Sequence, residues 1–86
     1  MNAEARAEIR RVLRAHARLP VDPDALQDDA DLFQAGMTSL ATVNVMLALE
    51  DAFEIEFPDR MLTRSVFESV DGIAGALQEL ATATAA

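Results

Sequence analysis

Apolar residues recur with the period of an α-helix near both ends of the chain. From Asn2 to Ala17 the pattern predicts an amphipathic helix whose other side carries arginines. From Val70 to Ala81 it predicts a last helix, for which Ser69 is a suitable N-cap. Gly72 and Gly75 weaken this last helix by roughly 1 kcal/mol each against alanine, and we expect their missing side chains to allow close helix packing. The stripe positions are Ala5, Ile9, Val12, Leu13 and His16 in the first stretch, and Val70, Ile73, Ala74, Leu77, Leu80 and Ala81 in the last.

A third helical pattern covers Thr38 to Phe53 in the middle of the chain. Gly36 lacks a Cβ and therefore suits a sharp turn before this helix. Thr38 or Ser39 can cap the first N–H groups of the helix. A hydroxyl at this position lies at the positive end of the helix dipole, where a phosphate is favourably placed. The apolar residues that indicate one face of the helix are Leu40, Val43, Met46, Leu47 and Phe53.

Two connections join the three helical stretches. The first, residues 19–37, is long, contains two prolines near its start and is rich in aspartate. Connections of this length are uncommon unless something holds them down. In the second connection, Ile55 or Phe57 is expected to point inward, and Pro58-Asp59 begins a short helix over residues 60–64. The residues expected to hold the first connection across the end of the bundle are Leu26, Leu32 and Phe33.

The aspartates of the first connection suggest a comparison with calcium-binding loops. In the register that starts at Asp22, Gln27 stands where such a loop needs glycine, and Phe33 stands where it needs a bidentate glutamate. We therefore expect a solvated acidic loop and no metal site.

The 86 residues suffice for one small domain, which we place at residues 1–81, followed by a flexible tail over 82–86. The net charge of −8 is uneven, since residues 1–18 hold five arginines against two glutamates and the rest holds two arginines against thirteen acids. The acidic body argues against nucleic-acid binding and favours docking on basic patches of partner proteins. There is no cysteine for a disulfide, no apolar run of membrane-spanning length and no secretory signal, so we expect a cytoplasmic, bacterial-type protein.

Several motifs follow one another around the middle helix. They are Asp31-Leu32-Phe33, the spacing Gly36-x-x-Ser39-Leu40, the helical segment Leu49-Glu50-Asp51-Ala52-Phe53, and Phe57-Pro58-Asp59. In this order they resemble the acyl and peptidyl carrier proteins, and the resemblance extends from about Ile9 to Leu80. It implies an all-α fold, a four-helix bundle with three longer helices, one short third helix and a long loop between helices 1 and 2.

The resemblance also implies a prosthetic group. In the family, the serine before the leucine, here Ser39, carries a 4'-phosphopantetheine arm that a phosphopantetheinyl transferase attaches from coenzyme A. The thiol of the arm holds an acyl or aminoacyl group as a thioester. An acyl or aminoacyl ligase or synthase and downstream transfer enzymes are then the partners of a monomeric, non-enzymatic carrier. The residues implied to flank or recognise the site are Thr38, Leu40, Met37, Glu50, Asp51 and Met61, with Leu62 beside it.

Two positions depart from the family pattern. Aspartate usually precedes the serine, whereas this chain has Thr38, which still can cap the helix. The fatty-acid branch carries acids along the first turns of this helix, whereas residues 41–44 are Ala-Thr-Val-Asn. The second departure favours a specialised carrier, aminoacyl or secondary-metabolic, over a housekeeping fatty-acid carrier.

Other functions fit the sequence less well. One histidine, with no cysteine, tyrosine or tryptophan, leaves no convincing catalytic set, and the lone His16 favours a structural role over a ligand role. The main alternative is a non-enzymatic helical interaction module without a prosthetic group, whose binding would not depend on Ser39. A calcium-responsive regulator is the third reading, which a calcium titration tests.

Overall fold

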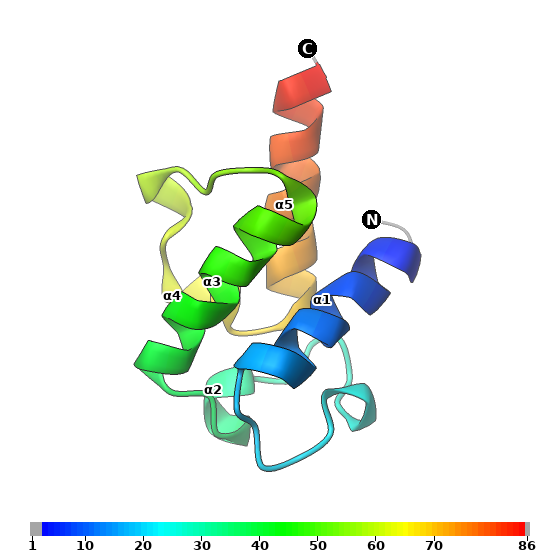
Figure 1. Cartoon of the computed structure of the whole chain (residues 1–86), viewed down its shortest axis with the longest axis vertical. Helices are drawn as coiled ribbons and strands as arrows, with labels where there is room; N and C mark the ends of the chain where they lie inside the picture. The colour runs from blue at the N-terminus through cyan, green and yellow to red at the C-terminus, as the bar shows by residue number, and fades with distance from the viewer. Residues whose placement is uncertain (1–2, 86) are drawn as a thin grey trace.

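The computed structural model describes residues 3–85, and side chains within residues 3–81. Every regular element in this range is helical, which confirms the all-α fold (Figure 1). Three long helices form the frame: α1 (Ala3–His16), α3 (Ser39–Phe53) and α5 (Val70–Ala85). Shorter elements interrupt the connections, namely η1 (Pro23–Ala25), α2 (Leu32–Ala35), η2 (Asp59–Met61) and α4 (Arg64–Phe67).

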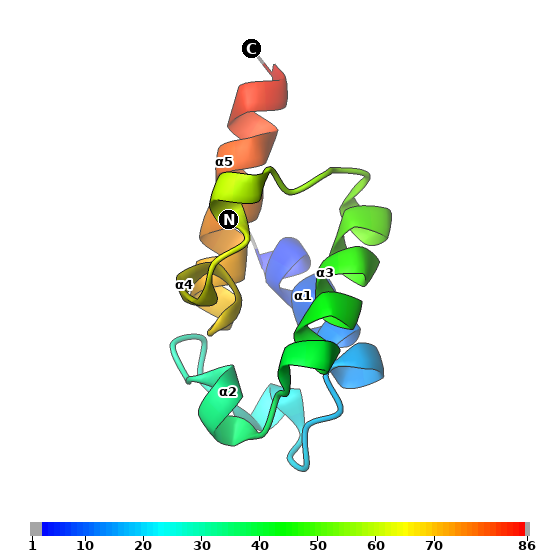
Figure 2. The same ribbon diagram turned by 90° about the vertical axis from the view of Figure 1, so that its left-hand side faces the viewer.

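The first helix packs against both other long helices, and α4 packs against α5 (Figures 1 and 2). The predicted stripe of α1 is confirmed at Ile9, Val12 and Leu13, which are buried. His16 is exposed, because the stripe continues through the buried Ala17 instead. From the connections the core receives Leu32, Met37, Phe57, Met61 and Phe67.

The apolar face predicted for α3 is wrong. The residues of α3 that face the core are Ala41, Val45 and Leu49, each four positions after the last. The helix carries apolar residues nearly all round, so its periodicity does not decide which side is buried. The predicted face is exposed at Leu40 (74%), Val43 (48%) and Leu47 (53%), and partly buried at Met46 and Phe53.

The long connection between α1 and α3 crosses the end of the bundle and is held there by charge (Figure 1). The loop is exposed and acidic as expected, but two of its aspartates, Asp24 and Asp28, are also ion-paired while keeping 52% and 43% of their side chains exposed. Arginines on the amphipathic first helix reach across to them, and one of these arginines also reaches the start of α5. The ion pairs are Arg6–Asp28 (3.1 Å), Arg6–Asp71 (2.7 Å), Arg10–Asp28 and Arg14–Asp24.

Backbone hydrogen bonds and apolar contacts fix the same connection. The N–H of Asp71 donates to the carbonyl of Asp28 at 2.9 Å, and the N–H of Leu32 donates to the carbonyl of Glu68 at 2.7 Å. The predicted anchors are confirmed, since Leu32 is buried and Leu26 and Phe33 pack partly buried against the core. Near the end of the connection, α2 ends at its C-cap Gly36, where φ is 123° and an added Cβ would lie 2.8 Å from Pro20.

The second connection differs from the prediction in where its helix lies. Residues 59–61 form only the turn η2, Thr63 is extended at φ −127° and ψ 159°, and α4 begins after it at Arg64. The extended residue explains why one short helix over residues 60–64 does not form. As expected, Phe57 is buried, and its ring meets that of Phe67 edge-on with centroids 5.4 Å apart.

The last helix begins as predicted. Ser69 Oγ accepts a hydrogen bond from the N–H of Gly72 at 3.0 Å, as an N-cap does. Close packing holds at Gly72, where an added Cβ would lie 2.6 Å from the carbonyl oxygen of Ser65, but Gly75 has open space around it. The helix α5 runs to Ala85, so the flexible tail at residues 82–86 stays a prediction, with Ala86 outside the described residues. Within residues 3–85, none of the helices combines the length and the apolar character needed to cross a membrane.

Candidate functional site

Ser39 is the first residue of α3, and its neighbour Thr38 is the N-cap. Thr38 Oγ1 accepts a hydrogen bond from the N–H of Ala41 at 3.1 Å, while the Thr38 carbonyl accepts one from Thr42 Oγ1 at 2.8 Å. This confirms that the helix is capped here and assigns the cap to Thr38. The Ser39 side chain is exposed, and its hydroxyl has no hydrogen-bond partner among the described residues. Of two adjacent hydroxyls, therefore, one is used by the fold and the other faces solvent.

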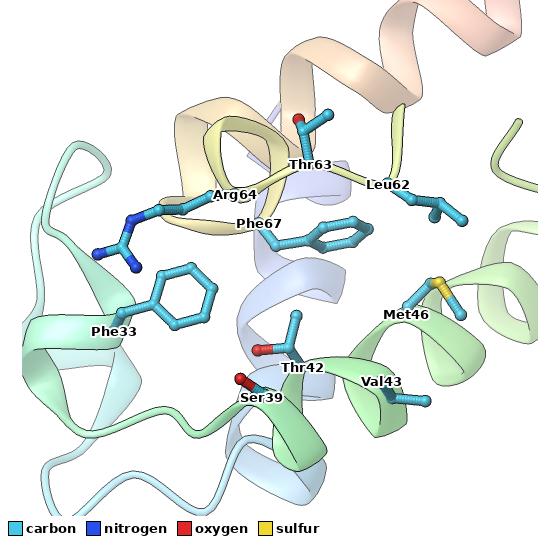
Figure 3. A pocket seen from close by; sticks show the side chains of 9 residues that line it. All are labelled: Phe33, Ser39, Thr42, Val43, Met46, Leu62, Thr63, Arg64 and Phe67. Carbon is cyan, nitrogen blue, oxygen red and sulfur yellow. The ribbon is translucent and has the colours of Figure 1, made fainter. Parts of the chain in front are cut away.

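A pocket of about 350 Å³ opens beside Ser39, between α3 and the segment that leads into α4 (Figure 3). From α3 the lining residues follow Ser39 at helical spacing, so that one side of the helix forms one wall. The opposite wall comes from residues 62–67, and the end of the pocket comes from α2. The lining residues are Phe33, Ser39, Thr42, Val43, Met46, Leu62, Thr63, Arg64 and Phe67.

Arg64 is the one charged residue in this lining. Its guanidinium carbon lies 4.5 Å from the centroid of the Phe33 ring, within the range of a cation–π interaction. Two carboxylates lie near its edge: Asp31 is 3.7 Å from Nη2 and Glu68 is 3.9 Å from Nε. The side chain keeps 64% of its surface exposed, so these contacts leave it largely in solvent.

Three of the predicted flanking residues lie in different surroundings. Leu40 follows Ser39 and is 74% exposed, so it adjoins the hydroxyl on the surface. Met37 and Met61 are each 3% exposed, belong to the core and do not line the pocket. Leu62, which follows Met61, is 46% exposed and does line it.

The predicted acidic residues lie at the far end of α3 from Ser39. Glu50 Oε2 accepts a hydrogen bond from the backbone N–H of Phe57 at 2.9 Å, so this carboxylate fixes the connection that follows the helix. Asp51 is exposed. Glu50, near the negative end of α3, therefore has a structural role, whereas Asp51 lies on the surface.

Sequence reasoning missed several of the pocket residues. Thr42, Val43 and Met46 stand three, four and seven positions after Ser39, so helical spacing from the serine could have found them. Arg64 and Phe67 could not be found in this way, because their position depends on the extended residue that precedes α4. Metal ligands do not assemble in the described region, where no group of three or more His, Cys, Asp or Glu side chains could hold an ion.

Comparisons with known proteins agree with this geometry. Residues 6–77 match the family described as "Phosphopantetheine attachment site". An "Aminoacyl carrier protein" of Agrobacterium fabrum is 46% identical over 67 residues, which are 78% of this chain and 81% of that protein.

Solved structures are similar as well. One is a crystal structure of an engineered Bradyrhizobium japonicum glycine:[carrier protein] ligase complexed with a carrier protein from Agrobacterium tumefaciens and AMP. A chain of that structure superposes on this protein with a TM-score of 0.83 at 42% identity, and the match covers 85% of this chain and 97% of that one. A chain in the structure of the Bradyrhizobium japonicum ligase with a glycylated carrier protein gives 0.72 at 25% identity, covering 83% and 95%. The chain therefore belongs to the phosphopantetheine attachment-site family of carrier proteins, whose cofactor is the 4'-phosphopantetheine arm.

Proposed function

We propose that Ser39 carries the phosphopantetheine arm and that the protein presents aminoacyl groups, bound to that arm as thioesters, to partner enzymes. The observation that carries the proposal is the exposed Ser39 hydroxyl at the first position of α3, beside a neighbour whose own hydroxyl is engaged as a cap.

The surroundings of Ser39 fit such a group. The helix start offers backbone N–H groups and a positive partial charge to a phosphate on Ser39 Oγ. Apolar side chains of the adjacent pocket, among them Val43 and Phe67, can receive the uncharged part of an arm. When bound, the arm supplies a thiol, which the cysteine-free chain lacks. Attachment forms a bond between Ser39 Oγ and the phosphorus next to the pantetheine, with loss of the hydroxyl proton and departure of the remainder of coenzyme A as adenosine bisphosphate.

The relatives support an aminoacyl cargo. One is named an aminoacyl carrier protein, and two similar structures contain carrier proteins with a glycine ligase. The uncharged first turns of α3, residues 41–44, also support a specialised carrier over a fatty-acid carrier. We propose that an aminoacyl ligase loads this chain, that transfer enzymes unload it, and that the carrier, a cytoplasmic monomer, catalyses no reaction of its own.

The test is intact mass after incubation with coenzyme A and a phosphopantetheinyl transferase. We expect the parent chain to gain the mass of one arm and Ser39→Ala to gain none. Thr42→Val is the matched control, because it removes a neighbouring pocket hydroxyl at nearly constant shape and should still be modified. A parent chain that stays unmodified, or a Ser39→Ala variant that gains the arm, would contradict the site and favour an interaction module without a prosthetic group.

A second incubation tests the cargo. The modified protein is mixed with ATP, glycine and a glycine:[carrier protein] ligase, and a mass gain of one glycyl group that hydroxylamine removes is expected. A modified protein that gains an acyl group from a fatty-acyl ligase and none from the glycine ligase would contradict the aminoacyl assignment alone.

A further inference from the structure

We propose that Arg64 pairs with the phosphate of the arm and so directs the arm across the pocket beside Ser39. The inference rests on the proposed attachment at Ser39, and it adds a positioning residue on a different element of the fold.

The charge distribution around the pocket favours this role. A phosphodiester carries one negative charge, and the protein that would hold it has a net charge of −8. Five of the seven arginines lie within residues 1–18, which leaves only Arg60 and Arg64 in the rest of the chain. Of these two, Arg64 lines the pocket that Ser39 also lines, and no other lining residue is charged.

The placement of Arg64 on the rim is fixed by its surroundings. It is the first residue of α4, directly after the extended Thr63. Figure 3 shows its guanidinium above the Phe33 ring, and the Ser39 oxygen directed toward the side of the pocket on which Phe33 lies. A cation–π contact with a ring uses none of the guanidinium N–H groups, so they stay available to a phosphate.

The two carboxylates near the edge of the Arg64 guanidinium compete only weakly with a phosphate for its N–H groups. Asp31 and Glu68 lie 3.7 and 3.9 Å from Nη2 and Nε, and the Arg64 guanidinium donates no hydrogen bond among the described residues. Exposed ion pairs of this kind contribute little to stability, because solvent screens them. Arginine binds phosphate through two parallel hydrogen bonds, which a carboxylate beyond 3.5 Å does not provide. A phosphate held covalently at the same pocket can therefore accept hydrogen bonds from the Arg64 guanidinium and replace its long contacts with Asp31 and Glu68.

The chain offers a matched control in Arg60. Its side chain is 62% exposed against 64% for Arg64, and it too has a long ion pair, 3.4 Å to Glu79. Arg60 lies in η2 and does not line the pocket. Replacing either arginine by glutamine removes one exposed positive charge, but only Arg64→Gln removes it from the pocket.

The test uses phosphorus NMR on the modified forms of the parent, Arg64→Gln and Arg60→Gln, with Arg side-chain Nε–Hε signals of the parent recorded before and after modification. We expect the phosphodiester resonance of Arg64→Gln to shift from that of the parent, the resonance of Arg60→Gln to coincide with it, and the Arg64 Nε–Hε signal to move on modification. High salt should shrink the difference between Arg64→Gln and the parent.

A modified parent whose Arg64 Nε–Hε signal stays at its unmodified position overturns the inference, and this measurement needs no variant to fold. Equal phosphorus shifts in Arg64→Gln and Arg60→Gln overturn it too. Either result leaves the attachment at Ser39 intact, whereas a parent that gains no arm removes the proposed function itself.

Discussion

The packing of α5 against α4 predicts opposite effects for the same substitution at two glycines of one helix. At Gly72 an added Cβ would lie 2.6 Å from the carbonyl oxygen of Ser65 and 2.7 Å from that of Val66. Both are backbone atoms, so the contact is relieved only if α4 moves as a unit. At Gly75 nothing lies within 4 Å of the added Cβ.

The expected changes in the free energy of unfolding combine the helix propensity of alanine with the cost of overpacking. Alanine gains about 1 kcal/mol over glycine inside a helix. Overpacking costs about 1–3 kcal/mol, and two contacts with rigid carbonyls favour the upper end of that range. Gly75→Ala should therefore raise the free energy of unfolding by about 1 kcal/mol, and Gly72→Ala should lower it by about 2 kcal/mol. For a chain of this size, each kcal/mol corresponds to about 4–8 °C in Tm.

The assay is urea and thermal unfolding followed by far-ultraviolet circular dichroism, because the chain has no tryptophan or tyrosine to report by fluorescence. Equal denaturant slopes for both variants would show that only stability has changed. A Gly72→Ala protein as stable as Gly75→Ala would refute the close approach of α4 to α5. It would also undermine the position of the pocket wall that α4 carries.

Three further substitutions test the frame around the site. Thr38→Ala should lose about 1 kcal/mol of unfolding free energy with its cap, while Thr38→Ser should keep most of it; equal urea midpoints for the two would disprove the capping bond. Glu54→Gly should raise Tm by relieving about 1 kcal/mol of left-handed strain at φ 53°, and a lower Tm would show that Glu54 is stabilised by something else. Leu49→Ala should cost about 2–5 kcal/mol because Leu49 is fully buried, whereas Leu47→Ala, at 53% exposed, should stay within about 0.5 kcal/mol in the same unfolding assay; the reverse order would restore the predicted face of α3.

The starts of α3 and α5 could be predicted because they depend on local chemistry, whereas the predicted start of α1 at Asn2 lies outside the described residues. Thr38 and Ser69 are hydroxyl residues before apolar runs, and Gly36 supplies the backbone angle that the turn needs. Ser39 was predicted as the attachment residue for the same reason, together with the motif order around it, and that assignment remains a proposal. These features need no knowledge of distant contacts.

The buried face of α3 and the place of α4 could not be predicted, because both depend on tertiary contacts. On α3, the leucines at 40 and 47 are as apolar as the buried Leu49, so hydropathy ranks them equally. The ion pairs of α1 were missed too, since Arg6 and Asp71 are 65 positions apart. Where a helix keeps apolar residues on the side toward solvent, composition alone does not distinguish core from surface.

The ion pairs between α1 and the following connection also decide where the molecule's long-range electric field originates. Residues 1–31 hold five arginines and seven acids, whereas residues 32–86 hold two arginines and eight acids. Attraction at a distance therefore comes mostly from the later part of the chain, which includes the acids near the C-terminal end of α3: Glu50, Asp51, Glu54, Glu56 and Asp59. We expect a positively charged partner to be attracted to that end first, and Ser39, which we propose as the attachment residue at the opposite end of the same helix, to meet the partner only on contact. The acids that orient the carrier at a distance and the residue that we propose for attachment thus lie at opposite ends of one helix. Added salt weakens the long-range attraction much more than the contacts made after docking.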